Sequence, residues 1–428
     1  MPKNITKAKK LSLLNPDDIY RVVLPNEIVV LARSSFNSPS ISIGGYVSAG
    51  ALFESDEKLG LADFVASSLM RGTQTRTFDA IYNELESVGA SLGFDSGVHT
   101  TSFGGRALVE DLPLLLRLLS ESLQTPTFPI DEIEKLRAQM LTGLAMRAQD
   151  TSDMAAMAFD RMLFDGHPYS RPSDGFVETI QSITRADMER FHRLYFGPKG
   201  MVISIVGAIE PKKAADVVAR ALGSWQVPGQ VGAPALPPHK PLKRTARHHH
   251  TLAGKSQSDL VIGIVGPRRT DPEFFSASLG NSVLGQFGMM GRIGEVVREK
   301  SGLAYYASSS LNAGTGPGTW EVSAGVNPKN LKKAIDLIEK ELRRFIKNGV
   351  TKEELADSQA NYVGRLPLSL ESNSGVASAI LNIERYELGF DYYQRYENMI
   401  HAVTRADVLE TARKYIDPDR LVISTAGP

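Results

Sequence analysis

The chain has no cysteine among its 428 residues. Disulfides, cysteine-ligated zinc, iron–sulfur clusters and thiol catalysis are therefore excluded, and any metal ligand would have to be His, Asp or Glu. Charge of one sign is not in excess either, because 48 Lys and Arg stand against 48 Asp and Glu. This balance excludes a polybasic nucleic-acid binder held by phosphate contacts.

Long apolar runs are also missing. The purely apolar stretches, such as residues 260–262, fall far short of the roughly 20 residues needed to cross a bilayer. The first 18 residues carry lysines but lack the apolar core of roughly 7–15 residues that a signal peptide needs. We therefore predict a protein with no membrane span and no nucleic-acid partner. Its predicted location is the cytoplasm, unless a signal peptide preceded this sequence and was removed.

The local motifs of common enzymes are absent. The sequence has neither a phosphate-binding Gly-x-x-x-x-Gly-Lys-Ser/Thr loop nor a Gly-x-Ser-x-Gly nucleophile elbow. No two of its histidines stand four residues apart around a Glu, so they form no local zinc helix. His248–His250 are predicted to be solvated loop residues, and His167 is predicted to be a loop or packing residue.

A Pro- and Gly-rich segment, residues 227–250, divides the chain into halves of similar size and is predicted to be a linker. The halves are related by a repeat. Residues 184–187 (TRAD) recur as residues 404–407, and without gaps the match gives 11 identities in 24 positions. Each copy predicts an N-capping Thr, a short helix, a Pro-containing turn and an apolar strand.

Two helices upstream of these copies also correspond. Leucines recur at helical spacing over residues 112–123, and apolar residues recur in the same order over residues 331–342. The halves are thus predicted to be homologous modules, each a sheet covered by helices on one face. Two such halves facing each other would enclose a groove or chamber that is suited to binding.

Short motifs along both halves resemble one known family. They are residues 24–27 (LPNE), 60–62 (GLA), 71–73 (RGT), Phe78, 85–90 (LESVGA), 126–128 (PTF), 166–169 (GHPY), 298–300 (REK) and 303–305 (LAY). Together they resemble the pitrilysin/insulinase (M16) zinc peptidases, in particular the mitochondrial-processing-peptidase-like branch. The resemblance implies an α+β fold of the LuxS/MPP-like metallohydrolase type. Its two halves would each be a mainly antiparallel sheet covered by helices, facing each other across a chamber.

The sequence departs from this family at the zinc site. Active members carry His-x-x-Glu-His between the Gly-Leu-Ala and Gly-Thr landmarks, where this chain has Asp63, Ala66 and Ser67 at the ligand and base positions. The third ligand, a Glu, would fall near residues 142–144 (TGL), which contain no carboxylate. Asp63 alone cannot hold zinc, and Ala66 cannot deprotonate a metal-bound water. We predict no metal in this chain and interpret Asp63 as an N-cap or surface carboxylate.

Arg298 and Tyr305 match the family's second signature. From spacing alone they would be a cation in the last turn of a helix stopped by Gly302 and a half-buried strand tyrosine. The resemblance implies that they reach across the chamber to the scissile carbonyl, where their donors stabilise the developing negative charge. The segment 90–96 (ASLGFDS) matches the edge strand that pairs with an extended peptide in the family, but has Leu92-Gly93 where active members commonly have Asn-Ala. An ordinary edge strand is an equally good interpretation of this segment.

These observations lead to a prediction with one alternative from another class. The chain is predicted to be the non-catalytic subunit of a heterodimeric M16 peptidase, with Arg298 and Tyr305 supporting a site whose zinc belongs to a homologous partner. Alone it would be inactive, and in isolation it could form a homodimer. The alternative is an inactive homologue that serves as an assembly or scaffold subunit. A peptidase that acts alone through an unrecognised metal site is a third possibility. The predicted domains are a tail (1–19), a first half (20–226), the linker (227–250) and a second half (251–428).

Overall fold

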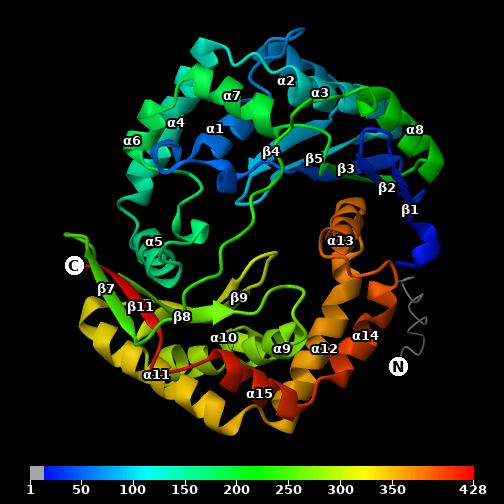
Figure 1. Cartoon of the computed structure of the whole chain (residues 1–428). Coiled ribbons are helices and arrows are strands. Elements are labelled where there is room, and N and C mark those ends of the chain that lie inside the picture. The colour runs from blue at the N-terminus through cyan, green and yellow to red at the C-terminus, as the bar shows by residue number, and fades with distance from the viewer. Residues whose placement is uncertain (1–13) are drawn as a thin grey trace, which may run out of the picture.

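Two β-sheets form the framework of the protein, and their inner faces are turned towards each other across the middle of the molecule (Figure 1). The computed structural model describes residues 14–428, except for the side chains of residues 287–290. Helices cover the outer side of each sheet. The arrangement confirms the predicted α+β class with two halves. None of the described helices is both long and apolar enough to cross a membrane.

The first sheet is built from strands of the first half. They are β1 (Tyr20–Val23), β2 (Val29–Ser34), β3 (Ser40–Val47), β4 (Ser91–Ser96), β5 (Thr101–Leu108) and β6 (Val202–Gly207). Their order is β1-β2-β6-β3-β5-β4, and all neighbours are antiparallel except β2 and β6. Its outer helices are α1 (Leu61–Ser68), α2 (Phe78–Ser87), α3 (Leu112–Gln124), α4 (Ile130–Arg147), α6 (Val177–Ser182), α7 (Arg185–Tyr195) and α8 (Pro211–Leu222).

The second sheet repeats this plan with strands of the second half. They are β7 (Ala246–Thr251), β8 (Ser258–Gly266), β9 (Ala304–Asn312), β10 (Gly318–Val326) and β11 (Val422–Gly427). Their order is β7-β11-β8-β10-β9, with one parallel pair, β7 and β11. Apart from one that crosses to the first sheet, the helices of this half are, in chain order, α9 (Phe274–Gly285), α10 (Phe287–Gly294), α11 (Leu331–Asn348), α12 (Lys352–Ser369), α14 (Tyr392–Ala402) and α15 (Arg405–Tyr415).

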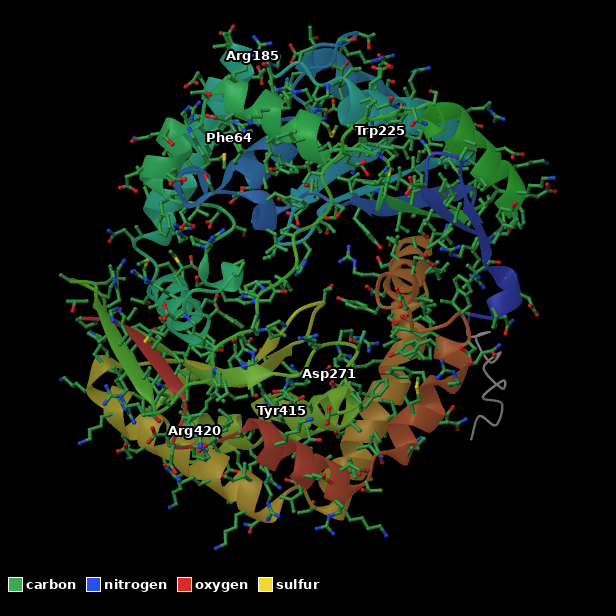
Figure 2. The ribbon with its side chains drawn as sticks, viewed as in Figure 1. Phe64, Arg185, Trp225, Asp271, Tyr415 and Arg420 are labelled. Carbon is green, nitrogen blue, oxygen red and sulfur yellow. The ribbon has the colours of Figure 1, made fainter. Side chains whose placement is uncertain are left out.

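The predicted repeat is confirmed at the level of single hydrogen bonds. The backbone N–H of Thr184 donates to Oδ2 of Asp187 at 2.8 Å, and that of Thr404 donates to Oδ2 of Asp407 at 2.7 Å. Each threonine hydroxyl oxygen in turn accepts the N–H of its Asp, so both α7 and α15 begin with a capping box. The two helices lie on opposite outer sides of the molecule, as Arg185 and Tyr415 show in Figure 2. Each leads into the buried strand of its sheet, β6 or β11.

Two helices are exchanged between the halves. α5 (Thr151–Leu163) belongs to the first half but packs Phe159 and Leu163 against Val261 and Val422 on the inner face of the second sheet. α13 (Asn373–Arg385) belongs to the second half and packs on the inner face of the first sheet, against β3 and β6. Each helix covers only part of its face, since β4, β5, β9 and β10 remain beside it (Figure 1). Because each half carries a helix of the other, the halves form one unit.

The predicted boundaries need two corrections. The end of the predicted linker, including His248–His250, is part of strand β7, because its backbone pairs in parallel with β11. Only the stretch before Ala246 is irregular. The predicted tail is also shorter than expected: residues 1–13 lie outside the described residues, but Leu14 and Ile19 are buried in a cluster with α13.

Candidate functional site

Helix α1 carries the three residues at the zinc-motif positions. Ala66 is buried, Ser67 is exposed, and Asp63 lies half-buried one turn before Ser67 on the same face of the helix. The Ser67 hydroxyl donates to Oδ1 of Asp63 over a long 3.5 Å. Burial and the like charges of Asp174 and Asp95 raise the pKa of Asp63 to about 6. Asp63 is in no ion pair of the described residues, which agrees with this raised pKa.

These residues do not fit a zinc ion. Thr142, at the expected third position, lies in α4 and donates its hydroxyl to the carbonyl of Ala138 at 2.8 Å. Across the part of the chain that the structure describes, no three His, Asp or Glu side chains are grouped so that they could hold a metal. A catalytic zinc site needs three such ligands and an open position. No hydrolytic step can therefore be derived from this helix.

Glu54, which the sequence analysis missed, occupies the cap of α1. The interpretation of Asp63 as an N-cap is wrong, because Gly60 takes that position with φ +88° and the carboxylate of Glu54 accepts the N–H groups of Gly60 and Ala62 at 3.1 and 2.6 Å. Glu54 is buried, and burial raises its pKa to about 8 against the lowering effect of these two hydrogen bonds. It lies seven residues before α1, so no local sequence pattern indicates the contact.

Arg298 lies at the end of the helical segment that follows α10. The last turn, Glu295–Glu299, is a π-helix, and Gly302, with φ +60°, ends the helix as predicted. The N–H of Gly302 donates to the carbonyl of Arg298 at 2.9 Å. Single π-turns inside helices often occur at functional sites. The side chain of Arg298 is half-buried and makes no ion pair with the described residues.

Tyr305 is the extra residue of a β-bulge in strand β9. Tyr306 pairs with Gly325 of β10 and Ala304 pairs with the next residue, Val326, so Tyr305 has no partner in the register. Ala304 packs on the core of the second half, whereas Tyr305 is 71% exposed and not half-buried as spacing alone predicts. A bulge re-aims side chains in this way and is common beside active sites.

The neighbouring Tyr306, in contrast to the exposed Tyr305, is held in place by a hydrogen bond. Its hydroxyl donates to Oδ1 of Asp259 at 2.7 Å, and Nε2 of Gln257 lies 3.0 Å from both oxygens of the same carboxylate. The third donor is Thr151 at the start of the exchanged helix α5. Asp259 is only 1% exposed. The burial of Tyr306 and its hydrogen bond to Asp259 raise the pKa of the Tyr306 hydroxyl. The buried carboxylate thus ties the first half to the strand that carries Tyr305.

Comparison with known proteins identifies the family. The model of the insulinase family, peptidase family M16, matches residues 29–181, and the model of the peptidase M16 inactive domain follows it over residues 182–362. The chain belongs to peptidase family M16. It is therefore an M16 member whose zinc motif is replaced, as the geometry of α1 shows.

Proteins similar to this M16 chain include a zinc protease, a solved inactive domain and a subunit of the cytochrome b-c1 complex. An uncharacterised zinc protease of Mycobacterium leprae is 26% identical over 91% of this chain and 87% of its own length. The crystal structure of a peptidase M16 inactive domain from Pseudomonas fluorescens is 25% identical, with a TM-score of 0.86 over 96% of this chain and 98% of that one. Subunit 1 of the mitochondrial cytochrome b-c1 complex of Bos taurus is 25% identical over 62% of this chain and 55% of its own length.

The remaining predicted residues of this M16 chain are also located. The predicted edge strand is β4, which, among the strands that the structure describes, pairs only with β5. His167 is a packing residue, as predicted: it is 3% exposed and its Nδ1 accepts the N–H of Tyr169 at 3.1 Å. His248 and His249 are exposed as predicted, but on strand β7 and not in a loop. Arg298 and Tyr305 both belong to the second half, whereas Asp63, Ala66 and Ser67 belong to the first.

Proposed function

We propose that this chain is the zinc-less subunit of a heterodimeric M16 peptidase, with Arg298 and Tyr305 acting on peptide bound at the zinc of a homologous partner. The observation that carries the proposal is the contrast between the two signatures. The zinc-motif positions on α1 keep a single carboxylate, Asp63, whereas Tyr305 is held in the open by a bulge and Arg298 is left without an ion pair among the described residues.

The role of the two residues would be electrostatic. A phenol hydroxyl and a guanidinium can donate to the oxygen on which negative charge develops, and one well-placed donor of this kind contributes about 2.7–4 kcal/mol. Arg298 could also hold a peptide carbonyl or carboxylate through two donors in a fixed geometry. The zinc, its water and the general base would all come from the partner, since α1 of this chain supplies none of them.

The test is peptide turnover by the complex purified through a tag on this chain. We expect Arg298→Ala with Tyr305→Phe to reduce turnover at least about tenfold while the complex stays assembled. A matched control is Arg190→Ala with Tyr82→Phe, which changes the same residue types at exposed positions on the outer helices α7 and α2. Unchanged turnover in the first double variant would refute the proposal.

A second candidate function is assembly. The similarity to subunit 1 of the cytochrome b-c1 complex favours a chain that holds a larger assembly together without taking part in proteolysis. Arg298 and Tyr305 would then be dispensable, and the tagged chain would be recovered in an assembly without peptidase activity. The same purification therefore separates the two candidates.

A further inference from the structure

A cavity of about 490 Å³ lies on the inner face of the first sheet, between strands β3 and β5 and the exchanged helix α13. One stripe of α13 lines it with Ser374, Ser378, Asn382 and Arg385, at the spacing of successive helical turns. The sheet contributes further hydroxyls and the guanidinium of Arg106. The lining contains two arginines and no Asp or Glu, although the whole chain has no net charge.

The two guanidiniums are available to a ligand. Neither Arg106 nor Arg385 makes an ion pair with any described residue, and the acid next to Arg385, Glu384, is already paired with Arg21 at 2.8 Å. Cζ of Arg385 lies 4.3 Å from the ring centroid of Tyr46. Arg385 also shares a side-chain hydrogen bond with Tyr46, which fixes the guanidinium and leaves its remaining donors for a carboxylate.

The floor between the two arginines has no side chains. Gly104 of β5 pairs with Gly44 of β3 and with Gly93 of β4, so three glycines form a row across the sheet. A Cβ added at Gly104 or Gly93 would meet nothing within 4 Å, whereas one at Gly44 would lie 3.3 Å from Leu381 of α13, so the open part of the row is on β5 and β4. Arg106 lies opposite Ser42, and Arg385 lies over Tyr46, four residues further along β3. Four extended residues span about 13 Å, so the cations stand at the two ends of a peptide-sized floor.

From this geometry we infer that the cavity binds a carboxylate of an extended peptide, with the peptide main chain over the glycine row. The carboxylate is that of an acidic side chain or of the peptide C-terminus, because both present the same planar acceptor. The inference rests on the proposed function only in taking the ligand to be a peptide. It adds a preference for acidic over neutral segments in the chamber, set by this chain and not by the partner.

Binding to the pure full-length chain tests the inference without any turnover. The probes are ten-residue peptides with a neutral fluorophore: one with four Glu and an amidated C-terminus, one with Gln at those positions, and the Gln peptide with a free C-terminal carboxylate. Fluorescence anisotropy should show at least about tenfold tighter binding of a carboxylate-bearing peptide than of the amidated Gln peptide. The Glu peptide and the free-terminus peptide then distinguish the two carboxylate sources.

The variants assign the binding to the cavity. Arg106→Gln and Arg385→Gln should each weaken binding of the preferred peptide at least about fivefold, and Gly104→Val should weaken it by filling the floor, where an added Cβ would meet nothing within 4 Å. Arg190→Gln, an exposed cation on the outer helix α7, is the control for net charge and should leave binding unchanged. Equal affinity for all three peptides, or affinity that no cavity variant alters, would overturn the inference. Because no partner is needed, this outcome is independent of the Arg298 and Tyr305 test.

Discussion

Replacing Tyr306 by Phe removes one hydroxyl from strand β9 and leaves the ring in place. That hydroxyl lies 2.7 Å from Oδ1 of Asp259, a carboxylate that is 1% exposed. A hydrogen bond to a charged group contributes about 1.5–3 kcal/mol to stability. Its loss leaves Asp259 with the donors of Thr151 and Gln257 alone. We therefore expect Tyr306→Phe to lower the free energy of unfolding by about 1.5–3 kcal/mol.

Tyr305→Phe is the matched control, since it is the same substitution one residue earlier. Tyr305 is 71% exposed and its hydroxyl has no hydrogen bond to the described residues. Surface substitutions of this kind change stability by no more than about 0.5 kcal/mol. The two variants should therefore affect different properties. Tyr306→Phe should lower stability, whereas Tyr305→Phe should lower turnover by the complex.

Thermal unfolding followed by circular dichroism measures the difference. At about 2.1 cal/mol/K of unfolding entropy per residue, a change of 1 kcal/mol shifts the midpoint of one cooperative unit of 428 residues by about 1 °C. Tyr306→Phe should then melt about 1.5–3 °C below both the wild type and Tyr305→Phe. Equal midpoints for the two variants would refute the reasoning that Asp259 fixes β9 beside the bulge.

Three further predictions concern other parts of the chain. Burial raises the pKa of Glu54 from its ordinary 4.5 to about 8, so its contribution to the free energy of unfolding is fully present below about pH 4.5 and is lost as the pH rises to 8. Glu54→Gln should therefore flatten the change in urea midpoint between these pH values, and an unchanged slope would contradict this prediction. Thr184→Ala and Thr404→Ala each remove a capping box and should cost about 1 kcal/mol in urea unfolding, whereas no loss in either would mean that the caps do not stabilise α7 and α15. EDTA should leave the melting temperature of the pure chain unchanged, because the described residues offer no set of three metal ligands, and a fall of several degrees would reveal a bound metal.

Much of the fold could be predicted because it depends on local patterns. The leucines on the predicted face of α3 are buried, and both capping boxes form at the repeated Thr-Arg-Ala-Asp motif. The exchange of α5 and α13 could not be predicted, since an apolar helix face does not say which sheet it will cover. Strand β7 was missed because its residues are polar and its pairing with β11 is made by the backbone.

The candidate site was predictable only in part. The loss of the zinc ligands follows from the resemblance to the family, which locates the motif positions, and Gly302 ends the helix of Arg298 as its position suggests. The bulge at Tyr305 depends on the register between β9 and β10, which residues far apart in the sequence determine. The bonds of Asp259 to Thr151 and Tyr306 likewise join segments distant in the chain, so no sequence window contains them.

The most direct test of the divided active site is native mass spectrometry of this chain isolated from its own cells, with stoichiometry and metal read together. The account predicts a complex with a second chain of similar mass, in which the pair carries one zinc and the separated chain carries none. A homodimer or larger assembly without zinc would contradict it, and so would zinc retained by this chain alone.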